Sequence, residues 1–74
     1  MEYRELILNR LHEMAIETYV ENEDKVNEII CFSGGYLRLY QQTIFIYDYT
    51  LVNFSYNSVI EACQKCYQLA NNLA

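Results

Sequence analysis

Two cysteines separated by two residues are the first candidates for chemistry in this chain of 74 residues. Two thiolates at the spacing of Cys63 and Cys66 can bind zinc or cycle as a redox pair. A redox pair sits at a helix N-terminus, whereas Cys63 lies about five residues inside a helix that is expected to start at Ser58. Zinc would need further ligands, and only Cys31 and His12 remain, without motif spacing. We therefore expect buried, reduced thiols that pack as small apolar side chains, with no metal and no cofactor.

No other arrangement of side chains in the sequence predicts catalysis. No Ser, Cys or carboxylate lies at a spacing from His12 that would predict an acid–base pair or an activated nucleophile. We therefore expect an exposed histidine without a catalytic role. Gly34-Gly35 is expected to join two strands and is not followed by Lys-Ser or Lys-Thr, which excludes a phosphate-binding loop. The sequence thus predicts no catalytic residues and a protein that is not an enzyme.

The charge and length of the chain narrow its classes of partner. Ten acidic against five basic residues give a net charge of −5, which disfavours direct binding of DNA or RNA because Lys and Arg drive phosphate binding. No run of about 18 apolar residues and no signal peptide is present, so we expect a cytoplasmic protein without membrane contact. The length indicates one domain, residues 1–74, with a thin core.

Residues 3–20 show the periodicity of one amphipathic helix. Its apolar stripe would be formed by Tyr3, Ile7, Leu11, Met14, Ala15 and Thr18. On another side of such a helix, Glu13, Glu17 and Glu21 stack at i, i+4 spacing. This row is either a solvated face or an acidic surface that meets a basic groove of a partner. Three apolar residues point to the same side, by accident or as part of a docking surface: Leu6, Ile16 and Val20.

The middle of the chain is expected to form a three-stranded antiparallel meander. Residues 25–33 are rich in β-formers and precede Gly34-Gly35, which predicts a strand and a tight hairpin. Further strands are expected at 36–41 and 44–49, joined tightly at Gln42-Thr43. In the first strand either Val26, Ile30 and Phe32 or Ile29 and Cys31 face the core, and we prefer the first set.

The last third of the chain predicts a second helix. Residues 50–57 are either a connection anchored by Leu51, Val52 and Phe54 or a short fourth strand, and we prefer the connection. Ser58 and Glu61 match a capping box, so a helix is expected to begin there and to continue nearly to the last residue. Its apolar stripe would be formed by Val59, Ala62, Cys63, Cys66, Ala70 and Leu73.

The alternation of residues 36–49 separates two faces of the predicted sheet. Leu37, Leu39, Ile44 and Ile46 share one face, and we expect both helices to pack on it, which gives an α+β fold of order α-β-β-β-α. The other face is left open and is unusually aromatic. Its members are Tyr36, Arg38, Tyr40, Phe45, Tyr47 and Tyr49.

The open aromatic face is the main indication of function. Tyr and Arg are enriched where proteins bind one another. RNA-binding sheets also carry aromatic side chains, but this stretch lacks their basic and glycine-rich pattern. We expect a small acidic interaction module, of the kind found as inhibitors or regulators in phages and mobile elements, that occupies a basic nucleic-acid-binding surface of a partner protein. The alternative is a homodimeric structural or assembly subunit that pairs through this face.

Overall fold

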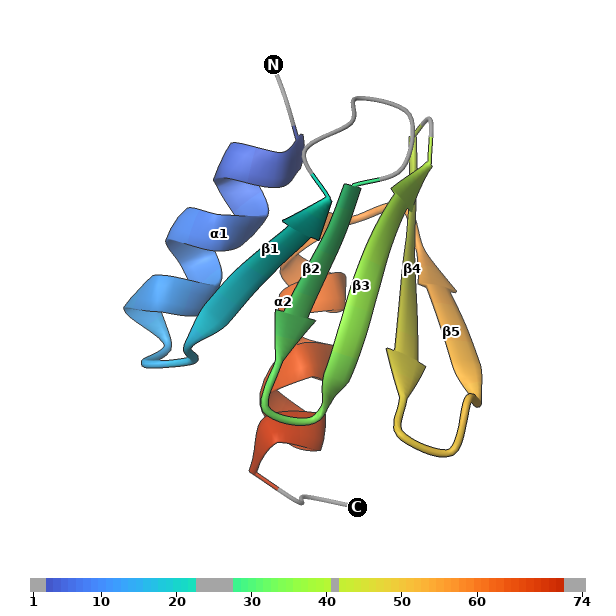
Figure 1. Ribbon diagram of the computed structural model, residues 1–74. Helices are drawn as coiled ribbons and strands as arrows, with labels where there is room; N and C mark the ends of the chain where they lie inside the picture. The colour runs from blue at the N-terminus through green and yellow to red at the C-terminus, as the bar shows by residue number, and fades with distance from the viewer. Residues whose placement is uncertain (1–2, 23–27, 41, 72–74) are drawn as a thin grey trace.

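A computed structural model describes residues 3–22, 28–40 and 42–71 of the chain. The elements follow in the order α1 (Tyr3–Glu13), β1 (Thr18–Asn22), β2 (Glu28–Phe32), β3 (Gly35–Tyr40), β4 (Thr43–Asp48), β5 (Asn53–Tyr56) and α2 (Val59–Ala70). The five strands form one antiparallel sheet in the order β1-β2-β3-β4-β5 (Figure 1). The α+β class is confirmed, but the sheet has five strands instead of three. None of the helices in these ranges is long and apolar enough to span a membrane.

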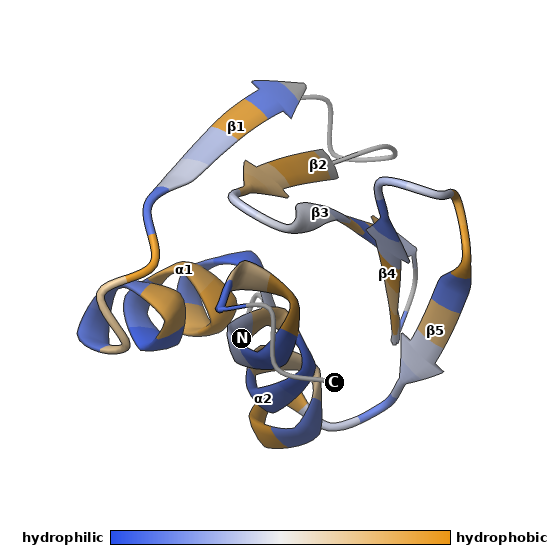
Figure 2. Ribbon diagram, turned by 90° about the horizontal axis from the view of Figure 1, so that it is seen from below, coloured by the Kyte–Doolittle hydropathy of each residue, from blue (hydrophilic) through white to orange (hydrophobic). Residues whose placement is uncertain are grey.

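Both helices lie on one face of the sheet, as predicted. The sheet curves around them, so that α1 lies near β1 and α2 lies against β3, β4 and β5 (Figure 2). Leu37, Ile44 and Ile46 on this face are fully buried, and Leu39 is partly buried. The alternation of residues in β3 and β4 therefore identified the buried face correctly.

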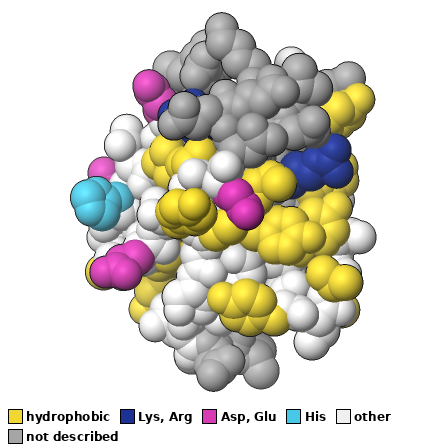
Figure 3. Space-filling model, in the orientation of Figure 1, with side chains coloured by type: hydrophobic (Ala, Val, Ile, Leu, Met, Phe, Trp, Pro, Cys, Tyr) yellow, Lys and Arg dark blue, Asp and Glu magenta, His cyan; other side chains and the backbone are white. Residues whose placement is uncertain are grey.

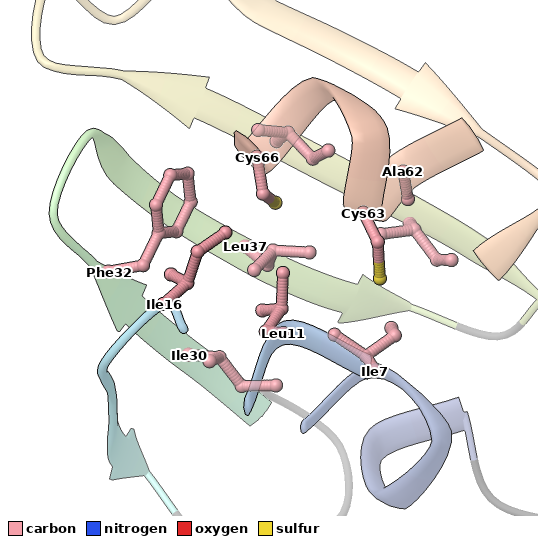
Figure 4. Close-up of a cluster of buried hydrophobic side chains, with 11 residues drawn as sticks. Ile7, Leu11, Ile16, Ile30, Phe32, Leu37, Ala62, Cys63 and Cys66 are labelled. Carbon is pink, nitrogen blue, oxygen red and sulfur yellow. The ribbon is translucent and has the colours of Figure 1, made fainter. Parts of the chain in front are cut away.

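One apolar cluster joins the two layers (Figure 4). It consists of Ile7, Leu11, Ile16, Ile30, Phe32, Leu37, Ile44, Ile46, Ala62, Cys63 and Cys66. Within the described ranges, no polar or charged residue is buried in it. Because the sheet and the helices bury their apolar sides together in this cluster, it supplies most of the driving force for folding.

The first helix is shorter than the sequence predicted, because the chain reverses direction at Ala15. Helix α1 ends at Glu13, and Ala15 adopts a left-handed conformation with φ 61°. The amide of Ile16 donates to the carbonyl of Leu11 at 2.9 Å, and the amide of Ala15 donates to that of His12 at 3.0 Å. These two bonds are the Schellman motif, which normally has glycine at the left-handed position. Buried Ile16 and Leu11 add the apolar contact that accompanies this motif.

This reversal removes the predicted acidic row. Glu13 ends α1, Glu17 lies in the connection and Glu21 lies in β1, so the three carboxylates do not stack on one helix. The predicted exposure of Ile16 and Val20 was also wrong, because Ile16 is buried and Val20 packs against the core. The acidic helix surface inferred from the sequence is therefore not formed.

The segment 50–57 contains a strand, so the preferred interpretation as a connection was wrong. β5 pairs with β4 in unbroken register from Asn53 to Tyr56. Of the three expected anchors, Leu51 and Val52 are exposed, and Phe54 is half-buried. The ammonium group of Lys65 in α2 lies 4.0 Å from the centroid of the Phe54 ring, a cation–π contact that ties the edge strand to the helix.

The hairpin between β2 and β3 is confirmed and depends on two glycines. A Cβ on Gly34 would lie 2.6 Å from the backbone of Leu69 in α2, and one on Gly35 would overlap the carbonyl oxygen of Tyr47 in β4. Close packing of the turn against both neighbours therefore requires residues without side chains. In β2, Ile30 and Phe32 face the core, as preferred.

Smaller differences concern the ends of elements. Thr43 pairs with Tyr40 and so belongs to β4 instead of a connection, and β4 ends at Asp48. Ser58 caps α2 as predicted, its side chain accepting from the amide of Glu61 at 3.4 Å. Val26 and Leu73, which were assigned to the core, lie outside the described residues.

Replacing Ala15 with glycine should stabilise the protein. Glycine adopts the left-handed conformation without the clash of a Cβ, so we expect the free energy of unfolding to rise by about 1 kcal/mol. Urea denaturation followed by circular dichroism measures this change. Glu5→Gly, inside α1, is the matched control and should destabilise the protein. A loss of stability in Ala15→Gly would contradict the Schellman ending.

Candidate protein-interaction surface

The face of the sheet opposite the helices is the candidate site, and we call it the open face. Strand register places the following residues on it: Tyr19, Ile29, Cys31, Tyr36, Arg38, Tyr40, Phe45, Tyr47, Asn53 and Ser55. Figure 3 views the molecule from this side and shows apolar side chains gathered across its middle. Of the predicted site residues, Tyr36, Arg38, Tyr40, Phe45 and Tyr47 are thus brought together.

One row of this face crosses four strands. Tyr19 lies opposite Cys31, Cys31 opposite Tyr36, and Tyr36 opposite Tyr47. The rings of Tyr36 and Tyr47 stack with centroids 4.9 Å apart and planes 14° from parallel. Such a pair contributes about 0.5–1.5 kcal/mol beyond its buried area. It also holds both rings in one orientation, so that the aromatic surface is preformed.

A second row lies beside the first and mixes apolar and charged groups. Ile29 lies opposite Arg38, and Arg38 opposite Phe45. Ile29 and Phe45 are half-buried and Arg38 is exposed. Tyr40, which pairs with Thr43 near the end of β3, is 45% exposed. The open face therefore combines aromatic area with a guanidinium group, a combination typical of protein interfaces.

Tyr49 reaches the same region from outside the strands. It follows the end of β4, and its hydroxyl donates to the carbonyl of Phe32 at 3.3 Å. The side chain thus extends from the end of β4 toward the end of β2, while 74% of it remains exposed. Tyr49 was predicted to belong to the third strand, but it lies just beyond the end of β4.

Of the three predicted acidic site residues, Glu17 and Glu21 lie beside the aromatic rows, whereas Glu13 lies at the end of α1. The thiol of Cys31 donates to Oε2 of Glu21 at 3.6 Å. Partial burial, together with this bond and the nearby negative charge, raises the pKa of Cys31. Glu17 lines a shallow depression at the margin of the open face together with Tyr19, Cys31 and Ser33. The carboxylates therefore border the β1 side of the face and do not form a row of their own.

Sequence reasoning missed five members of the open face, which are Tyr19, Ile29, Cys31, Asn53 and Ser55. Tyr19 was assigned to a helix, so its position in an edge strand could not be anticipated. Ile29 and Cys31 belong to the alternating set of residues in β2 that we did not assign to the core. Their alternation with Ile30 and Phe32 was the sequence pattern that could have placed them on the open face. Tyr19 is 66% exposed and extends the aromatic row to the edge of the sheet.

The cysteines of α2 are packing residues in this structure. Cys63 and Cys66 are fully buried, and neither forms a disulfide. Burial raises the pKa of Cys63 to about 11 and raises the pKa of Cys66 as well. Both groups therefore lose their protons less readily than an ordinary thiol, which makes them poor nucleophiles. Across the described ranges, no group of three or more His, Cys, Asp or Glu side chains is placed to hold a metal ion.

His12 is exposed, as expected, but the structure gives it a neighbour that its sequence spacing did not suggest. His12 and Glu17 both line a shallow depression between α1 and β1. In the described part of the chain, no hydrogen bond or ion pair joins these two side chains. The lining is completed by Leu8, Asn9, Thr18 and Val20.

The burial of the thiols predicts how they react. In the folded protein only Cys31 should react with a thiol reagent, because Cys63 and Cys66 have no exposed surface. The other two thiols should react once denaturant unfolds the chain. Mass spectrometry after timed labelling measures this, and Cys31→Ser is the control that should abolish the early product. Early labelling of Cys66 would contradict its position in the core.

The raised pKa of Cys63 also predicts a pH dependence of stability. Above pH 9.0, the ordinary value for the thiol, the unfolded chain loses this proton, whereas the folded chain keeps it to about pH 11. The folded state then binds more protons, so the free energy of unfolding should fall as pH rises through this window. Urea denaturation at several pH values measures the slope. Cys63→Ala should show a shallower fall, and an equal slope would contradict this assignment.

Comparisons of the chain with known protein families, with curated proteins and with solved structures found no match in any of the three.

Proposed function

We propose that this protein is a small, non-enzymatic interaction module that binds a protein partner through its open face. The observation that supports this most strongly is the aromatic row formed by Tyr19, Tyr36 and Tyr47, on the face opposite both helices. Sheets with one solvated face usually carry polar side chains there. Aromatic side chains in their place expose apolar area that a partner would remove from water.

The open face is suited to binding because its side chains are held in place. Tyr has few rotatable bonds, so fixing it on binding costs little conformational entropy. The stacking of Tyr36 on Tyr47 lowers this cost further. Pairing across four strands, with a bulge between Val20 and Asn22 in β1, also keeps the backbone under these rings in one arrangement. Because a rigid surface loses little conformational entropy on binding, more of the free energy gained from the buried area contributes to affinity.

The charge around the open face favours a basic partner. The protein carries a net charge of −5, and Glu17 and Glu21 border the face along β1. We propose that these carboxylates meet a basic rim, which is the chemistry of a nucleic-acid-binding surface. Inhibition of such a partner is the finer form of this proposal. It rests on the charge at the β1 side, since the acidic helical row is not formed.

Replacing Tyr47 with aspartate tests the role of the face. The change places a charge in the aromatic row and removes the stacked pair, so we expect partner affinity to fall about 30-fold or more, as for an interface hot spot. The partner is first captured from a host extract with the wild type, and its affinity for each purified variant is then measured by calorimetry. Tyr67→Asp, an exposed tyrosine on α2, is the matched control and should bind normally.

Three results would contradict the proposal. Equal partner affinity of Tyr47→Asp and the wild type would exclude the open face as the partner-binding site. An equal loss of partner affinity in Tyr67→Asp would show that any added negative charge weakens binding, wherever it lies. A wild-type dimer that Tyr47→Asp converts to monomers would instead assign the face to a second copy of the chain. Circular dichroism confirms that each variant is folded.

A further inference from the structure

The two edges of the sheet differ in a way that bears on self-association. In β1 the pairing with β2 is interrupted by a bulge between Val20 and Asn22, and acidic Glu21 lies at this irregularity. Bulges and charges are the devices that prevent an edge strand from pairing with another chain. β5 has neither, since its four residues pair with β4 without a shift and include no charged residue and no proline.

The segment that contains β5 is uncharged and exposes apolar side chains. No Asp, Glu, Lys or Arg occurs from Tyr49 to Ile60, the longest uncharged stretch of this acidic sequence. Among the described residues, eight large apolar side chains are exposed, and four of them fall in this stretch. These four are Tyr49 at 74%, Leu51 at 70%, Val52 at 50% and Ile60 at 53%. They flank β5 on both sides along the chain, three before it and one after it.

The loop before β5 is held in a fixed shape. Oδ1 of Asp48 accepts from the amide of Thr50 at 2.9 Å, from its hydroxyl at 2.7 Å and from the amide of Val52 at 3.1 Å. Leu51 adopts φ 67°, a conformation that leucine rarely takes. The exposed positions of Leu51 and Val52 are thus set by the backbone, and the strain at Leu51 is retained without any contact in the core to compensate it.

We propose that two copies of this chain pair antiparallel along β5, related by a two-fold axis. Antiparallel pairing of a strand with itself brings the residues before β5 in one copy beside those after β5 in the other. Leu51 and Val52 of each copy then lie near Ile60 of the other, so the exposed apolar side chains cover one another. The strand itself presents no charged side chain to a second copy. The carboxylate of Glu61, at the start of α2, lies near Tyr56, and the protein as a whole would repel itself.

The pairing leaves the open face accessible. Edge-to-edge contact extends the sheet within its own layer, so the aromatic rows of the two copies would lie on one continuous ten-stranded surface. A partner with two equivalent sites could then bind both copies, which raises its overall affinity without new contacts. Dimerisation through β5 does not depend on the proposed partner and is tested on the protein alone.

Charge exchange at the two flanks of β5 tests the pairing. One variant carries Leu51→Asp and Ile60→Asp, and a second carries Leu51→Lys and Ile60→Lys. Sedimentation equilibrium from micromolar to millimolar concentration measures self-association of each. We expect a dimer for the wild type, at least tenfold weaker dimers for both variants, and recovery of dimers when the two variants are mixed, because opposite charges then face each other. Aspartate tolerates the left-handed conformation at position 51, so this variant should fold.

Two further measurements complete the test. Leu6→Asp with Tyr67→Asp makes the same charge change at exposed apolar positions outside the segment and should leave the dimer intact. Amide hydrogen exchange at Asn53–Tyr56 should slow as wild-type concentration rises, because pairing protects the outer edge of β5. A wild-type monomer at every concentration would overturn the proposal. So would a dimer that both charge variants retain, or one that only Tyr47→Asp disrupts.

Discussion

The burial of one apolar layer between the sheet and the two helices is the constraint on which the rest of the structure depends. A chain of this length can enclose little more than one such layer, because small domains bury a limited share of their surface. Ile7 and Leu11 from α1, and Cys63 and Cys66 from α2, meet the same face of the sheet. Both helices are used on this side, so the aromatic face is left to solvent or to a partner. The surface chemistry of the protein is thus a consequence of where its core lies.

The reversal at Ala15 decides how that layer is completed. A helix that continued to residue 20 would carry Ile16 and Val20 away from the sheet. The left-handed turn instead buries Ile16 and directs Thr18–Asn22 along β2 as an edge strand. Burial of one isoleucine contributes about 1.5–3 kcal/mol, which exceeds the cost of about 1–2 kcal/mol for alanine in this conformation. The cost of the left-handed conformation at Ala15 is therefore offset by the burial of Ile16 that it makes possible.

Charge is distributed unevenly between the two edges of the sheet. Acidic residues concentrate in the first third of the chain and border the open face along β1, whereas the opposite edge of the sheet is uncharged from Tyr49 to Ile60. The β1 side of the sheet thus carries negative charge, whereas the segment around β5 carries none. Both surfaces belong to the one sheet, and neither interferes with the other, since one is its face and the other its edge.

The sequence by itself determined the features that depend on short-range patterns. Alternation with period two assigned Leu37 and Ile46 to the core and Tyr36 and Tyr47 to the open face, because successive side chains in a strand point to opposite sides. Ser58 was recognised as a helix cap from its spacing to Glu61. The burial of Cys63 and Cys66 likewise followed from their place on the apolar stripe of α2.

Only the tertiary structure decided where α1 stops and which segments join the edges of the sheet. Alanine at a left-handed position carries no local signal, since glycine is the residue that normally marks it. β1 and β5 are short, and each forms because a neighbouring strand supplies hydrogen-bond partners and the helices cover one of its sides. Helical periodicity in residues 3–20 was misleading because Ile16 is buried and Val20 is partly buried against the core once β1 joins the sheet, an interaction that no local pattern contains. The position of Glu21 beside Cys31 depends on the same pairing of distant segments, and for this reason it could be known only from the fold.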